Sequence, residues 1–173
     1  SLGLVDLNTA RMASVVQLES TVSVMCYEPS LHALIAGGAD GTVSIFDVRT
    51  SARAAGRATV FSRGMVRDMD CSGHTLAAAG LFSRLGPLGQ QEFTYDSSLH
   101  TLDLRKYAGK YRPGPDIQFA PGTAQLRWHP TMSNTVIAAS PEGLLQTLDA
   151  VAYKGAPSQL RIEAVAEDGA QVC

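Results

Sequence analysis

The chain has 173 residues, of which 45% are hydrophobic and 17% charged, and its formal net charge is −2. A chain of this length can bury roughly 70% of the surface that its unfolded form exposes, so it can form a packed core. The near-neutral charge excludes neither nucleic acid nor acidic proteins as partners, so the positions of the charges matter more than their sum.

Three cysteines, Cys26, Cys71 and Cys173, are widely spaced. Their odd number and spacing fit neither a disulfide framework nor a zinc site, and they indicate reduced thiols in a cytosolic or nuclear protein. No apolar run approaches the ~18 residues of a membrane-spanning helix. The first ten residues lack Met, Lys and Arg, which argues against a signal peptide and suggests that the chain begins inside a longer one.

The first strand-like segments, Leu4–Leu7 and Ser14–Leu18, resemble the end of a repeat unit. Residues 21–50 then form the clearest complete unit. It contains three predicted strands separated by a Glu-Pro-Ser turn and a Gly-rich turn, at 22–27, 31–36 and 42–49. The third of these strands alternates apolar and polar residues, which is typical of a half-buried strand.

The same order of strands and turns recurs twice. The second copy has predicted strands at 65–70, 75–79 and 98–105, and the third copy has them at 123–129, 135–139 and 144–149. Weaker fourth strands are expected at 14–18, 58–61, 117–119 and 160–165. Each third strand ends in an apolar residue followed by aspartate, at Asp6, Asp47, Asp103 and Asp149.

These aspartates are separated by 41, 56 and 46 residues. A period of about 40–45 residues is that of a four-stranded propeller blade, and an insertion at 81–95 lengthens the middle interval. The insertion is expected either to dock a partner through its apolar residues or to be a disordered loop. We expect an all-β fold, a WD-repeat β-propeller segment with an incomplete ring. All 173 residues then belong to one propeller domain, with a blade remnant and three blades at about 1–20, 21–61, 64–119 and 122–166.

The blade aspartates are expected to accept hydrogen bonds from backbone amides of the turn that follows each strand. They are not expected to bind metal, because a two-metal nuclease needs its carboxylates within a few ångströms of each other. No sequence motif for a nucleophile, a phosphate-binding loop or a metal ligand set is present. We therefore predict no catalytic residue, cofactor site or metal site in this segment.

The hydrophobic-Asp pairs resemble those of WD repeats, although Trp-Asp and the usual Gly-His opening are missing. The phrases GGADGTVSIFDVRT, LHTLDLR and IQFAPGTAQLRWHP are similar to consecutive blades of the N-terminal propeller in the catalytic subunit of the poly(A)-nuclease deadenylase complex. The resemblance extends from Leu4 to about Tyr153. It implies a parent poly(A)-specific 3′–5′ exoribonuclease whose catalytic residues lie in a C-terminal domain that no segment here matches.

The resemblance also implies partners for this segment. As a non-catalytic scaffold in messenger-RNA deadenylation, it would dock the pseudokinase-like regulatory subunit and the poly(A) ribonucleoprotein, that is, poly(A)-binding protein and poly(A) RNA. No membrane partner is expected, and the expected location is the cytoplasm, including processing bodies. The alternative is a generic WD-repeat adaptor for protein–protein assembly, unrelated to RNA.

Basic residues gather in the connections between third and fourth strands, which emerge on one face of a propeller. Such a face attracts polyanions or acidic proteins, and tyrosines among cations suit the stacking of single-stranded bases. The alternative is a set of solvated loops in which Arg braces the turn after the blade aspartate. The candidate residues are Arg49, Arg53, Arg57, Arg105, Lys106, Tyr107, Lys110, Tyr111 and Arg112.

Overall fold

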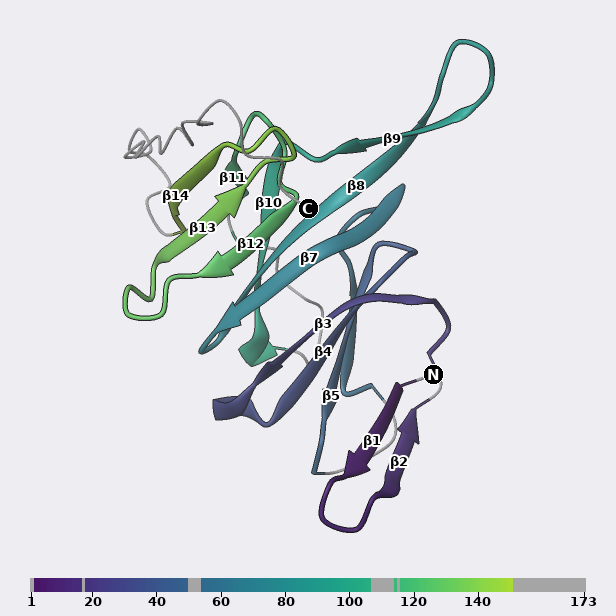
Figure 1. Cartoon of the computed structure of the whole chain (residues 1–173), viewed down its shortest axis with the longest axis vertical. Coiled ribbons are helices and arrows are strands. Elements are labelled where there is room, and N and C mark those ends of the chain that lie inside the picture. The colour runs from purple at the N-terminus through teal and green to yellow at the C-terminus, as the bar shows by residue number, and fades with distance from the viewer. Residues whose placement is uncertain (1, 17, 50–53, 107–113, 115, 151–173) are drawn as a thin grey trace, which may run out of the picture.

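The computed structural model describes residues 2–16, 18–49, 54–106, 114 and 116–150 (Figure 1). These residues form antiparallel sheets that stand beside one another, joined by turns and two short 3-10 helices. The expected all-β fold of propeller-type sheets is confirmed, and the ring is not closed. Within the described residues, none of the helices has the length and apolar character that a bilayer crossing requires.

The N-terminal sheet has two antiparallel strands, β1 (Leu2–Asp6) and β2 (Arg11–Val16). The next sheet is an up-and-down meander in the order β3-β4-β5-β6. Its strands are β3 (Val22–Glu28), β4 (Ala33–Gly38), β5 (Thr42–Asp47) and β6 (Gly56–Thr59). A 3-10 helix at Pro29–Leu31, followed by His32 with a φ of 49°, delays the start of β4 relative to the strand predicted at 31–36.

The third sheet has the order β11-β10-β8-β7, and β9 pairs with β8 beyond the end of β10. Its strands are β7 (Gly64–Ser72), β8 (Thr75–Leu85), β9 (Gln91–Tyr95), β10 (Ser98–Asp103) and β11 (Ile117–Gln118). A second 3-10 helix, Leu104–Lys106, follows β10. The strand predicted at 98–105 therefore ends earlier than expected.

The last sheet has three described strands in the order β12-β13-β14. They are β12 (Gln125–Trp128), β13 (Thr135–Ala139) and β14 (Leu145–Asp149). The strand predicted at 160–165 lies outside the described residues.

The outer strand of the second sheet begins and ends earlier than predicted. It is expected at 58–61, and the structure has it as β6 at Gly56–Thr59. Phe61 leaves the sheet edge and is buried, with only 4% of its surface exposed.

Each pair of neighbouring sheets encloses a hydrophobic core, and β8 shows why the sequence requires this. Leu76 and Ala78 pack into the cluster shared with β3–β6, whereas Ala77 and Ala79 pack into the cluster shared with β12–β14. Successive side chains of a strand point to opposite faces of its sheet, so an unbroken apolar run indicates a sheet covered on both sides. The third sheet is therefore packed between its two neighbours (Figure 1).

The insertion at 81–95 forms a β-hairpin rather than a disordered loop. The β8 strand continues past the end of β10 and pairs with β9 from Leu81↔Tyr95 to Leu85↔Gln91. The hairpin extends beyond the rest of the sheet (Figure 1), and Leu85, Leu88 and Phe93 near its tip are exposed. An ion pair at 3.0 Å between Arg84 Nε and Glu92 Oε2 links its two strands.

Candidate functional site

The turns that join first to second strands lie beside the connections that follow the third strands. Each pair of neighbouring turns is joined by one backbone hydrogen bond of the same kind, Val48 N to His32 O at 3.1 Å, Leu104 N to His74 O at 2.7 Å and Ala150 N to Asn134 O at 2.7 Å. The three sheets therefore repeat one arrangement at this end. We call it the connection face and define it by residues 29–32, 48–49, 73–74, 104–106 and 129–134.

Two of the predicted blade aspartates form the same tight turn on the connection face. Asp47 accepts the backbone N–H of Arg49 at 2.9 Å, and its two carboxylate oxygens receive Nε at 3.0 Å and Nη2 at 2.9 Å of the same arginine. Asp103 accepts the backbone N–H of Arg105 at 3.0 Å and the Nη2 of Arg105 at 2.7 Å. The expected bond from carboxylate to turn amide is therefore present in both turns, and the guanidinium adds a bidentate contact.

These contacts stabilise the charged forms of the groups that make them. The hydrogen bonds of the Arg49 side chain and backbone hold the pKa of Asp47 at about 2. The hydrogen bond to Asp103 raises the pKa of Arg105 above its usual value. Each arginine is therefore matched by a carboxylate beside it, which is the bracing role considered as the alternative to a polyanion face.

The remaining blade aspartates end the corresponding strands, Asp6 in β1 and Asp149 in β14. The four aspartates lie on four different sheets, as the repeat pattern predicts. Among the residues that the structure describes, no group of three or more His, Cys, Asp or Glu side chains could hold a metal ion.

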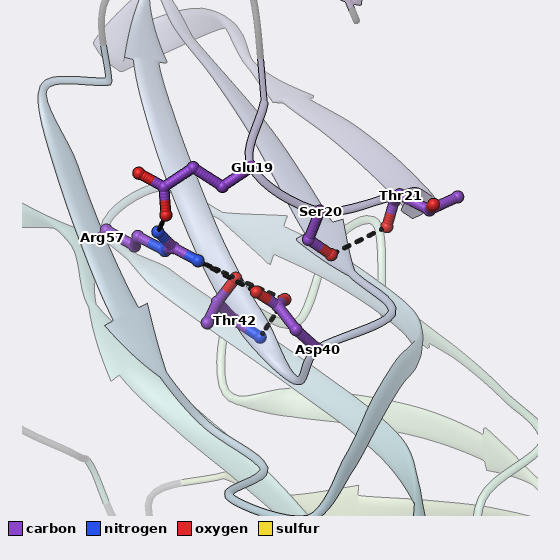
Figure 2. Close-up of polar contacts among 6 residues, drawn as sticks. All are labelled: Glu19, Ser20, Thr21, Asp40, Thr42 and Arg57. Carbon is purple, nitrogen blue, oxygen red and sulfur yellow. Dashed lines mark hydrogen bonds and ion pairs between the residues drawn. The ribbon is translucent and has the colours of Figure 1, made fainter.

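The candidate basic residues do not all lie on one face. Arg57 pairs with Ser44 across β5 and β6, and its guanidinium reaches Glu19 and Asp40 at the opposite end of the sheet (Figure 2). This position corrects the assignment of Arg57 to the connection-side group. Lys106 ends the second 3-10 helix, while Arg53, Tyr107, Lys110, Tyr111 and Arg112 lie outside the described residues.

The contacts of Arg57 organise the turn between β4 and β5. Its Nη1 donates to Glu19 and its Nη2 donates to Asp40 Oδ2 at 2.9 Å. Asp40 also accepts the backbone N–H of Thr42 at 3.1 Å and its hydroxyl at 2.7 Å. Burial raises the pKa of Asp40, but the hydrogen bonds from Thr42 and Ser20 and the charge of Arg57 outweigh this and lower it.

A hollow of about 200 Å³ lies next to this network. Its lining includes apolar side chains, among them Leu18, Val22 and Phe46, together with the polar groups of Thr42 and Arg57. Two carboxylates against one guanidinium leave this rim with one net negative charge. The end of the sheet opposite the connection face is therefore acidic at this point.

Two further carboxylates, for which no role is predicted from the sequence, join the third sheet to the last one. Asp68, 7% exposed, accepts the backbone N–H of Leu126 at 2.9 Å. Asp70 accepts the backbone N–H of Trp128 at 2.8 Å, and the Trp128 indole donates to the Asp70 carbonyl at 3.0 Å. The signal in the sequence is the alternation Asp-Met-Asp inside a predicted strand, which puts both carboxylates on one face of it.

Comparison with known proteins finds relatives of one kind. The chain is 30% identical to the PAN2-PAN3 deadenylation complex catalytic subunit PAN2 of Cryptococcus neoformans. The match extends over 145 residues, which are 82% of this chain. The chain is 28% identical over 151 residues to the same subunit of Debaryomyces hansenii, which covers 86% of it. The chain spans only 11% and 13% of these relatives. No protein-family model matches it.

The fold matches solved propellers. The WD40 domain of Neurospora crassa Pan2 superposes with a TM-score of 0.68 at 20% identity, over 85% of this chain and 42% of that one. A chain of the mitotic checkpoint complex gives a TM-score of 0.65 at 16% identity, over 88% of this chain and 43% of that one. The resemblance to the WD-repeat propeller of the deadenylase catalytic subunit, inferred from the sequence, is confirmed by the relatives and by this fold.

Proposed function

We propose that this chain is part of the propeller scaffold of a poly(A)-specific 3′ exonuclease, which removes poly(A) tails from messenger RNA in the cytoplasm. One observation carries the proposal, the similarity to catalytic subunits of the PAN2-PAN3 deadenylation complex over 82% of the chain. In this proposal residues 1–20, 21–61, 64–119 and 122–166 supply a partial blade and three further blades of one propeller. The chemistry takes place in another part of the parent protein.

The scaffold docks the regulatory subunit of the complex through the connection face. The repeated turns of that face are braced by hydrogen bonds, as in Asp47–Arg49 and Asp103–Arg105, so the surface is ordered before a partner arrives. A preorganised surface loses little conformational entropy on binding. Its paired charges also suit a protein surface better than bare phosphate.

Direct contact with poly(A) RNA is a separate part of the proposal. It depends on Lys106, Lys110 and Arg112 together with the two nearby tyrosines, since Arg49 and Arg105 are already paired with carboxylates. Removing three phosphate contacts makes the plot of log binding constant against log salt concentration less steep, by about 2 for a single strand. We expect this change in the parent protein when these three residues become Gln. An unchanged slope and affinity would remove RNA from the partners of this face.

The docking role is tested with the full-length parent protein and its regulatory subunit. Val48 and Met132 lie on the connection face with 37% and 49% of their surface exposed, so Val48→Glu and Met132→Glu change that surface without opening the core. Leu88, 91% exposed on the β8–β9 hairpin, provides the control Leu88→Glu. We expect the first two changes to weaken complex formation at least about tenfold, or 1.4 kcal/mol, and the control to leave it unchanged.

The same experiment separates the two functions considered. A parent protein that shortens poly(A) but binds its regulatory subunit equally well in all three variants is a deadenylase that docks elsewhere. A parent protein that neither shortens poly(A) nor binds that subunit is a general WD-repeat adaptor, and the proposed function is then wrong.

A further inference from the structure

Two cysteines from neighbouring sheets lie together at one core. Cys26 belongs to β3 and Cys71 to β7, and both are half-buried free thiols. Both pack against the same cluster of buried side chains, which includes Ile35 and Leu76, the residues directly opposite them in the strand pairing. Strands β3 and β7 lie side by side, so the cluster brings together thiols that are far apart in the sequence (Figure 1).

The two strands are held close by a direct contact near the other end of β3. Ser23 Oγ donates to the carbonyl oxygen of Val66 at 2.5 Å, which fixes the position of β3 against β7. Val66 is fully buried and Val24 packs against the same cluster. These contacts hold β3 against β7 at the end of β3 away from Cys26.

The environment of Cys71 favours the protonated thiol. A hydrogen bond with Cys26 is the largest cause, and burial and the charges of Glu28 and Asp70 act in the same direction, so the pKa of Cys71 is raised. A thiol of this kind is a poor nucleophile at neutral pH. Cys71 is therefore not the thiol that reacts first with an oxidant.

We propose that Cys26 and Cys71 are a redox modification site, at which a disulfide oxidant such as oxidised glutathione joins β3 to β7. The Cys26 thiolate attacks one sulfur of the oxidant and releases one glutathione thiolate. Cys71 then loses its proton and attacks the Cys26 sulfur of the mixed disulfide, which releases the second glutathione. Two protein thiols are thus oxidised to one disulfide while one glutathione disulfide is reduced to two thiols.

The cross-link would tie together two sheets that share one hydrophobic cluster and are joined by the hydrogen bond from Ser23 to Val66. A disulfide between distant residues removes conformations from the unfolded chain, so it stabilises the folded state when its geometry is relaxed. Oxidation would therefore lock the interface between the β3–β6 and β7–β11 sheets. Cys26 and Cys71 lie at the ends of β3 and β7 that lead into the connection-face segments 29–32 and 73–74, and the proposal does not depend on the proposed function.

The test uses the full-length protein incubated with oxidised glutathione at about pH 8, where thiolates are more abundant. After alkylation and digestion, mass spectrometry locates the disulfides. We expect a peptide that joins Cys26 to Cys71, a loss of these two free thiols and a higher melting temperature. The change Cys173→Ser should leave the cross-link intact, and Cys71→Ser should leave Cys26 as a stable mixed disulfide with glutathione.

Two results would overturn the proposal. One is recovery of both thiols in alkylated form after the protein has been oxidised. The other is a disulfide that joins either cysteine to a different partner in the folded protein. The mapping is made on the wild-type protein, so it remains decisive if a variant fails to fold.

Discussion

Replacing Asp68 by Asn tests whether a buried carboxylate holds neighbouring sheets together. One carboxylate oxygen accepts the Leu126 N–H and Arg127 Nη1, both at 2.9 Å, and the other accepts the Met69 N–H at 3.0 Å. The side chain is only 10% exposed. An amide has a single oxygen, so its NH₂ group faces a backbone N–H whichever way it is turned.

The loss can be worked out from these contacts. A hydrogen bond to a charged group contributes about 1.5–3 kcal/mol, and a buried donor left without a partner costs about 1–3 kcal/mol. Arg127 can turn to water because its side chain is 65% exposed, so its ion pair contributes only about 0–1 kcal/mol. We expect Asp68→Asn to lower the free energy of unfolding by about 2–3 kcal/mol. The control Arg127→Gln should lower it by less than about 1 kcal/mol.

Urea unfolding of the intact propeller measures both values. With a slope of about 2–3 kcal/mol per molar urea, the Asp68→Asn midpoint falls by about 1 M at unchanged slope. Equal losses in Asp68→Asn and Arg127→Gln would mean that the exposed ion pair, and not the buried amide contact, carries the stability. A loss below about 0.5 kcal/mol in Asp68→Asn would refute the role of the carboxylate altogether.

Gly41→Ala should cost more than about 2 kcal/mol and Gly73→Ala only about 1 kcal/mol in thermal melts. Both glycines have a positive φ, 75° at Gly41 and 57° at Gly73. A Cβ at Gly41 would lie 1.9 Å from the carbonyl oxygen of Phe61, whereas a Cβ at Gly73 would meet nothing within 4 Å. Equal losses of stability in the two variants would contradict the steric argument. Asp47 stabilises the fold above its ordinary pKa of 3.8, and this contribution is lost as the pH falls through its folded value of about 2. Asp47→Asn should therefore flatten acid unfolding across this range, and an unchanged fluorescence profile would count against the turn. Leu85→Lys should change stability by less than about 0.5 kcal/mol, because the side chain is 79% exposed. A larger loss in the same melts would mean that the hairpin tip is packed.

The strands could be predicted because their signals are local. The strand at Thr135–Ala139 has the predicted bounds, and β5 lies within the strand predicted at 42–49. The half-buried character expected of that strand is wrong, because all of Thr42–Phe46 is buried. Departures occur where a local hydrogen-bonding group competes with the ladder. The Glu28 side chain accepts the Ser30 N–H at 3.0 Å, caps a 3-10 helix and so delays β4.

The hairpin at 81–95 illustrates an ambiguity that the sequence does not resolve. Gly86, Pro87 and Gly89 suggest a loop, and the flanking apolar residues suggest a partner site. In the structure the flanks pair as β8 and β9, and Gly86 N donates to Gln90 O at 2.8 Å to close the turn. Pairing across a turn needs two strands in register, which propensity alone does not specify.

The repeat and the turns in which a blade aspartate accepts a backbone N–H could be predicted, because both depend on periodicity and on neighbours in the chain. Tertiary structure alone decided what Arg57 and Asp68 do. Arg57 meets Glu19 across 38 residues, and Asp68 meets the Leu126 N–H across 58 residues. From the sequence, the side chains of Arg57 and Asp68 could equally have been exposed to solvent. Only the packing of one sheet against the next brings their partners within hydrogen-bonding distance.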